Sequence, residues 1–139
     1  MLTTTRLDIE DARRIIAAAT DKAKEIGVPM CIAIADDSGN LIAFERMDGG
    51  KVTSITIAID KAYTAAAARK ATHEYGAASQ PGAPAYGINS AIGGRLMIVA
   101  GGLPVWSDGA VVGAIGVSSG TPAQDQVVAQ AGVDAFDGD

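Results

Sequence analysis

The spacing of apolar residues along the chain predicts three helices. Over residues 8–26, apolar side chains recur every three or four positions, which is typical of an amphipathic helix. Asp8 is a suitable N-cap for this helix. Residues 52–71, rich in alanine, predict a second helix, and Thr121 followed by Gln124 forms a capping-box pattern for a third.

Five short apolar runs predict strands, and two turn signals connect them into hairpins. The runs cover residues 30–35, 41–46, 96–100, 103–106 and 110–117. The turns are 36–40, rich in Asp, Ser and Gly, and 107–109, which reads Ser-Asp-Gly. The resulting order, α-β-β-α-β-β-β-α, lacks a regular strand–helix–strand repeat. We therefore predict an α+β fold with a mainly antiparallel five-stranded sheet and flanking helices.

Two segments lie outside these elements. Residues 76–94 contain several glycines and prolines, so we expect a long loop that can act as a lid over a pocket. Residues 134–139 are acidic, and we expect them to form a flexible tail. The remaining pattern is continuous, which predicts a single domain over residues 1–139.

Composition narrows the class of protein. The chain has 139 residues, of which 48% are hydrophobic and 19% charged, so a disordered chain is excluded. Its net charge of −5 without a basic stripe argues against nucleic acid and anionic membranes as partners. The one cysteine, Cys31, cannot form an internal disulfide, and we expect it to be a buried, inert thiol. The first residues lack an apolar signal-peptide core, so we expect a cytoplasmic protein.

Several short motifs occur in a fixed order from about residue 8 to 133. They are 33–41 (AIADDSGNL), 46–49 (RMDG), 60–65 (DKAYTA), 101–105 (GGLPV), 108–109 (DG) and 112–118 (VGAIGVS), with Asp125 and Gly132 in the last helix. In these motifs the chain resembles the GlcG/HbpS-like heme-binding (heme-degrading domain) proteins. The number and order of the motifs make the resemblance specific for the fold. Because most of them are turns and packing glycines, they say little about function.

The resemblance carries expectations about fold and partners. It implies a five-stranded antiparallel sheet that looks like a profilin or sensor domain. It implies a dimer or larger homo-oligomer, and a ligand that is heme or another small molecule. Some members of the family belong to operons for the breakdown of small acids, diols or aromatic compounds.

The segment after the alanine-rich helix carries the first group of candidate site residues. His73, the one histidine of the chain, can ligate heme iron or transfer protons near neutral pH. Its neighbour Thr72 is a candidate for ligand contact, and Glu74 is a candidate for proton transfer. Tyr75 is a candidate both for proton transfer and for iron ligation. The alternatives are a surface histidine at a helix end and a tyrosine ring that only packs.

Other candidates lie on the second strand, the second helix and a later strand. Arg46, beside Asp48, can clamp a carboxylate or heme propionate, or can pair with Asp48 or Glu45. Lys61, in an apolar helix next to Tyr63, can bind an anion, act as a base, or form a salt bridge with Asp60 or Glu45. The single tryptophan, Trp106, can stack on a flat ligand or pack in an oligomer interface.

Three functions are compatible with these residues. The first is a heme-binding protein that handles or senses heme, with His73 as iron ligand. The second is a cofactor-independent lyase, isomerase or hydrolase acting on a carboxylate or aromatic catabolic intermediate. The third is an oligomeric accessory protein of a catabolic operon. The first two require one cavity that brings Arg46 and Lys61 close to His73.

Overall fold

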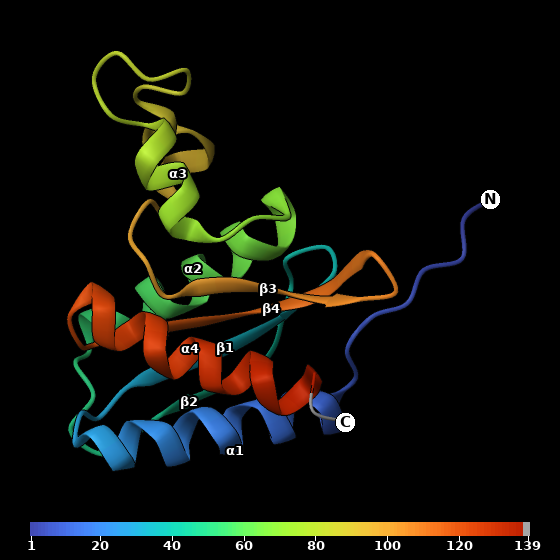
Figure 1. The fold of residues 1–139 in the computed structure, drawn as a ribbon, viewed down its shortest axis with the longest axis vertical. Helices are drawn as coiled ribbons and strands as arrows, with labels where there is room; N and C mark the ends of the chain where they lie inside the picture. Colours follow the sequence, from blue (N-terminus) through green and yellow to red (C-terminus); the bar gives the residue numbers. More distant parts are fainter. Residues whose placement is uncertain (138–139) are drawn as a thin grey trace.

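A computed structural model of the chain, which describes residues 1–137, places helices on both faces of a four-stranded antiparallel sheet (Figure 1). The elements are α1 (Ile9–Ile26), β1 (Cys31–Asp36), β2 (Leu41–Arg46), α2 (Thr53–Ala68), α3 (Thr72–Ala78), β3 (Gly102–Ser107), β4 (Ala110–Ser118) and α4 (Pro122–Asp137), with 3₁₀ turns at Ile88–Ser90 and Ile92–Gly94. The strand order is β2-β1-β4-β3, so β2 and β3 form the two edges. The α+β class is confirmed.

The sheet separates two apolar layers. Helices α1 and α4 lie side by side on one face, and α2 covers the other (Figure 1). The layer under α1 and α4 holds the large core side chains, such as Ile15, Ile34 and Ile115. The layer under α2 consists mainly of alanines, which allow the helix to approach the sheet closely.

Local capping signals place the helix ends where the sequence predicts them. Asp8 accepts a hydrogen bond from the Asp11 N–H (2.8 Å), and Asp11 in turn accepts one from the Asp8 N–H (3.1 Å). Gly27 ends α1 in the left-handed conformation, with φ 73°. The Thr121–Gln124 capping box is also formed, through hydrogen bonds of 2.9 and 3.2 Å.

The predicted strand over residues 96–100 is wrong, because the structure has no strand there. Two buried threonine hydroxyls form hydrogen bonds with the backbone groups of this segment that would otherwise pair with a neighbouring strand. Thr64 Oγ1 donates to the Arg95 carbonyl (3.1 Å) and accepts from the Met97 N–H (3.0 Å). Thr72 Oγ1 donates to the Val99 carbonyl (2.6 Å). The segment is therefore anchored to helices and does not extend the sheet.

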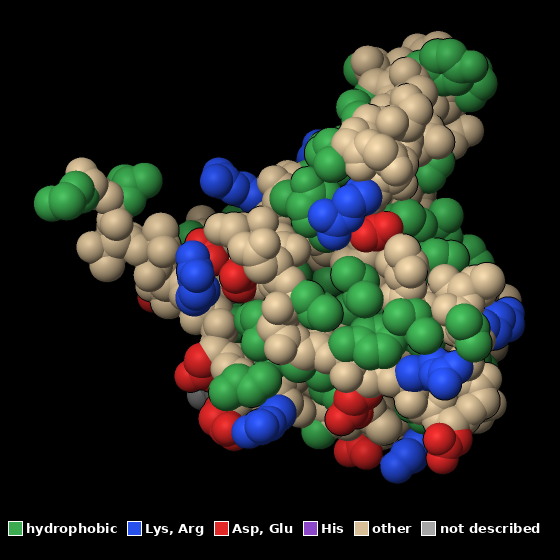
Figure 2. Space-filling view, turned by 180° about the vertical axis from the view of Figure 1, so that it is seen from behind, with side chains coloured by type: hydrophobic (Ala, Val, Ile, Leu, Met, Phe, Trp, Pro, Cys, Tyr) green, Lys and Arg blue, Asp and Glu red, His purple; other side chains and the backbone are tan. Residues whose placement is uncertain are grey.

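The predicted loop over residues 76–94 forms an arm together with α3. The arm projects away from the sheet (Figure 1), and Figure 2 shows that charge gathers only at its base. Residues 75–94 contain no Asp, Glu, Lys or Arg. No residue of 76–94 lines the hollows described below, so these positions do not support a lid.

Helix α4 is longer than predicted. It continues through residues 134–137, which were expected to begin a flexible tail, whereas residues 138–139 lie outside the described part of the chain. Across residues 1–137, no helix has both the length and the apolar character that a membrane span needs.

Candidate functional site

A hollow of about 460 Å³ lies where the end of α2, the start of α3, β3 and α4 meet. We call it the His73 hollow. Its lining residues are Arg69, Lys70, Ala71, His73, Glu74, Leu103, Pro104, Trp106, Gln126, Gln130 and Val133. The structure therefore brings together three of the predicted site residues, His73, Glu74 and Trp106.

The His73 hollow combines a flat aromatic side chain with cationic groups. Trp106 is 48% exposed, and His73 is also exposed. Arg69 and Lys70 form no ion pair with a carboxylate among residues 1–137, and Lys70 Nζ lies 4.8 Å from the centre of the Tyr75 ring. Glu74 is the one acidic residue in the lining. The hollow is thus locally cationic on a chain of net charge −5.

Two local features position His73 and Trp106 on either side of this hollow. Thr72 is fully buried, and its hydroxyl joins the start of α3 to β3 by accepting from the Gly102 N–H (3.0 Å). This contact holds the next residue, His73, beside β3. The pairing of β3 with β4 shifts register between Val105 and Trp106, and such bulges redirect side chains at sheet edges.

Arg46 and Asp48 lie at the opposite edge of the sheet. Arg46 ends β2, and Asp48 is exposed in the turn that follows. Because β1 and β4 separate β2 from β3, about 14 Å of sheet separates the two edge strands. Neither residue lines the His73 hollow. The single cavity shared by Arg46, Lys61 and His73 is therefore not formed, and a ligand next to His73 would meet Arg69 and Lys70 in place of Arg46 and Lys61.

Lys61 is a structural residue in the interior. Its side chain is 2% exposed, and Nζ donates to Asp125 Oδ2 (2.9 Å) and to the Val117 carbonyl (2.8 Å). Burial lowers the pKa of Lys61, and the hydrogen bond to Asp125 opposes that shift. A salt bridge was one of the predicted alternatives, but the partner is Asp125 and not Asp60 or Glu45. This position does not allow Lys61 to hold a ligand.

The remaining candidates also have structural partners. Tyr63 lies under the Arg95 guanidinium, 3.9 Å from the ring centre, and Arg95 Nε donates to Asp60 (3.0 Å). Tyr75 is half-buried beneath Lys70, and Thr72 is fully buried. An acid–base mechanism in which Arg46 or Lys61 holds a carboxylate next to His73 therefore has no support in the arrangement.

A second hollow, of about 510 Å³, adjoins the His73 hollow, and we call it the Thr5 hollow. Its lining residues are Thr3, Thr4, Thr5, Asp37, Arg69, Trp106, Ser107, Asp108, Gly109, Ala110 and Val111. Arg6 holds Asp37 through an ion pair of 2.9 Å. Arg69 and Trp106 line both hollows, so these two residues mark the junction between them.

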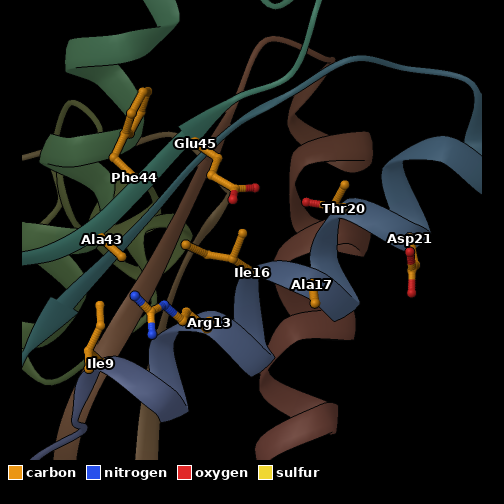
Figure 3. A pocket seen from close by; sticks show the side chains of 9 residues that line it. All are labelled: Ile9, Arg13, Ile16, Ala17, Thr20, Asp21, Ala43, Phe44 and Glu45. Atoms are coloured by element: carbon orange, nitrogen blue, oxygen red, sulfur yellow. The ribbon is translucent and has the colours of Figure 1, made fainter.

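A third hollow, of about 510 Å³, is a groove between α1 and β2 (Figure 3). Figure 3 shows Phe44 pointing away from this groove and Glu45 pointing toward α1. The lining contains two carboxylates, Asp21 and Glu45, and one cation, Arg13, which Glu10 already binds at 2.7 Å. The α1–β2 groove offers no histidine, tyrosine or free cation.

Cys31 is buried, as predicted. Its side chain is fully inaccessible, and burial raises the pKa of the thiol, an effect that the positive charge of Arg46 partly opposes. We expect a thiol reagent at neutral pH to label the native protein about 10³-fold or more slowly than the urea-unfolded chain. Fast labelling of the native protein would show that β1 opens readily or that the thiol is accessible.

No group of three or more His, Cys, Asp or Glu side chains in the described residues could hold a metal ion. A heme iron needs only one or two protein ligands, because the porphyrin supplies the other four. An exposed imidazole such as His73 is therefore sufficient for heme, although it is insufficient for a bare metal.

Comparisons with known proteins agree with this fold. Residues 7–134 match the family described as "Haem degrading protein HbpS-like". An uncharacterized 15.0 kDa protein from the dhaT-dhaS intergenic region of Citrobacter freundii is 44% identical over 90% of this chain and 88% of its own length. The crystal structure of a PduOC:heme complex has a TM-score of 0.91 and 34% identity, covering 94% of this chain and 95% of that one.

The chain belongs to the HbpS-like family. It is also 35% identical, over 94% of its length, to the corrinoid adenosyltransferase PduO of Salmonella typhimurium, but it spans only 39% of that protein. The adenosyltransferase activity named for the longer protein is therefore not assigned to this chain.

His73, Glu74 and Trp106 are candidates from the sequence, whereas the cations beside them in the hollow are not. Arg69 and Lys70 follow the last residue of α2 directly. The signal that could have identified them is a pair of adjacent basic residues shortly before the one histidine of the chain.

Proposed function

We propose that this protein binds heme in the His73 hollow, with His73 as the iron ligand, and acts in heme handling or sensing. One observation carries the proposal: the fold brings the single histidine and the single tryptophan, which are far apart in sequence, to the same cationic hollow. The heme complex of the 34% identical PduOC supports heme as the ligand.

The residues of the His73 hollow fit heme by their chemistry. The His73 imidazole can ligate iron, and the Trp106 indole offers a flat surface for stacking. Leu103, Pro104 and Val133 supply an apolar wall, and Lys70 can neutralise a propionate. Bound heme would supply a redox-active iron that can accept a further ligand.

The α1–β2 groove is a poorer site for heme. Its two carboxylates, Asp21 and Glu45, would repel the two propionates, and its one cation is occupied by Glu10. Its only oxygen ligands for iron are these carboxylates and the Thr20 hydroxyl. Charge and ligand type therefore favour the His73 hollow over this groove.

A hemin titration tests the proposal. We expect the wild-type protein to give a sharp Soret band that saturates at one equivalent of hemin per chain. His73→Ala should shift this band and weaken binding by at least about 10- to 100-fold, because even an outer partner of a metal ligand contributes that much. Absorbance spectra and a hemin-transfer assay measure both effects.

Two further variants locate the bound heme. Tyr75→Phe removes the other candidate iron ligand near the hollow and should leave the spectrum unchanged. Ala17→Phe fills the α1–β2 groove from an exposed position and should also leave binding unchanged. If His73→Ala binds like the wild type while Ala17→Phe does not, heme occupies the groove and the proposal is wrong.

A further inference from the structure

Arg69 has a backbone conformation that is unfavourable for arginine. It follows the last residue of α2 with φ 58° and ψ 40°, in the left-handed region. Helices commonly end this way, but glycine or asparagine usually occupies the position because a Cβ atom is strained there. Left-handed residues other than glycine persist where the surrounding structure or a function requires them.

No contact within the described chain explains this choice of residue. The Arg69 side chain is exposed, and it forms no hydrogen bond, ion pair or ring contact within residues 1–137. Another arginine that contacts α2, Arg95, is by contrast held by Asp60 and Tyr63. Arg69 is therefore a cation without a structural partner.

The position of Arg69 points to a ligand. Arg69 and Trp106 are the two residues that line both the His73 hollow and the Thr5 hollow. A flat ligand stacked against Trp106 in the His73 hollow would direct its rim toward this junction. An acidic group on that rim would meet the guanidinium, which binds a carboxylate through two parallel hydrogen bonds.

We propose that Arg69 is a ligand-binding residue that holds a carboxylate of a planar aromatic acid at the junction of the two hollows. The ligand class is a porphyrin or similar ring system with free carboxylates. The inference rests on the proposed function in placing the ring in the His73 hollow, and it adds a recognition of the acid group that does not depend on iron.

The chain contains a built-in probe for this binding. Trp106 is its only tryptophan and lies at the junction, so its fluorescence reports occupation of either hollow. We expect iron-free protoporphyrin IX to quench this fluorescence, and Arg69→Gly to weaken binding about 10-fold, the loss of one good charge-assisted contact. Protoporphyrin IX dimethyl ester, which has no free carboxylate, should bind both proteins equally.

Two controls separate charge from structure. Lys24→Met removes an exposed cation of α1 that lines none of the three hollows, and it should bind protoporphyrin IX like the wild type. Arg69→Gly should also melt at or above the wild-type temperature, because glycine relieves the left-handed strain. A residue kept for stability would instead lower the melting temperature.

The outcomes distinguish this inference from the proposed function. If Arg69→Gly binds protoporphyrin IX like the wild type, or the wild type does not bind it, the inference is overturned. If hemin gives a His73-dependent Soret band in that case, the proposed function still stands. If protoporphyrin IX binds through Arg69 but hemin shows no His73-dependent band, the inference stands and iron ligation by His73 is wrong.

Discussion

Replacing Lys61 by methionine is expected to destabilise the fold by about 3–5 kcal/mol, the usual cost of removing one partner from a buried ion pair. Lys61 and Asp125 are 1% and 3% exposed. Without Lys61, the Asp125 carboxylate keeps, among residues 1–137, only the hydrogen bond from the Gly120 N–H (2.9 Å). Urea unfolding of both proteins measures the difference in the free energy of unfolding.

A second substitution shows whether Lys61→Met loses stability because the Asp125 carboxylate is left buried without a partner. Lys61→Met combined with Asp125→Asn removes both charges while the amide oxygen still accepts from Gly120. We expect the double variant to recover more than half of the lost stability, so the two substitutions are strongly non-additive. If the double variant loses as much stability as Lys61→Met and Asp125→Asn lose separately when summed, the two residues are not energetically coupled.

The comparison with a surface ion pair isolates the effect of burial. Arg13 and Glu10 are 2.7 Å apart, closer than Lys61 and Asp125, but their side chains are 66% and 72% exposed. Arg13→Met should therefore cost less than about 1 kcal/mol. A large loss in this variant would show that the distance between the charges, and not their burial, determines their contribution.

The ion pair of Lys61 could be predicted from the sequence only in part. The pattern of the chain showed a lysine in an apolar helix and correctly suggested a salt bridge. It could not identify the partner, because Asp125 lies 64 positions along the chain on another helix. The nearby candidate Asp60 pairs with Arg95, another distant residue. Contacts between distant residues depend on tertiary packing, which periodicity does not encode.

The strand prediction failed for a related reason. Residues 96–100 form a short apolar run, and such a run is typical of a strand. Two hydroxyls from α2 and α3 satisfy the backbone of this segment. Helix caps and tight turns, by contrast, depend on neighbouring residues, so the Asp8 cap and the Ser107-Asp108-Gly109 turn were predicted correctly.

The sequence indicates individual residues of the candidate site but not their arrangement. His73 and Trp106 stood out because each is unique in the chain, and uniqueness is visible without a structure. Their meeting across α3 and β3 was not visible. The prediction of a cavity shared with Arg46 assumed that the end of β2 faces the segment after α2, whereas the strand order places β2 and β3 at opposite edges.

The close approach of α2 to the sheet leads to the second large expected effect. A Cβ atom at Gly116, in the second half of β4, would collide with the backbone of α2 at the Ala58 carbonyl and the Ala62 N–H. Neither backbone atom can move without displacing the helix. Gly116→Ala should therefore cost about 3 kcal/mol, the upper end of the usual range for overpacking.

This displacement should reach the ligand site as well as the fold. Arg69 and Lys70 follow the end of α2, so a shift of the helix away from β4 moves both cations relative to Trp106 on β3. We expect Gly116→Ala to weaken porphyrin binding even under conditions where the protein is fully folded. Urea unfolding measures the stability, and quenching of Trp106 fluorescence measures the binding.

Gly82→Ala is the matched control, because a Cβ atom there meets nothing within 4 Å and the glycine has φ +84°. It lies on the arm and should cost only the conformational strain of about 1 kcal/mol. It should leave porphyrin binding unchanged. Equal losses of stability in Gly116→Ala and Gly82→Ala would show that α2 can move away from β4 at little energetic cost. Gly116 would then be no more constrained by packing than a glycine in an open turn.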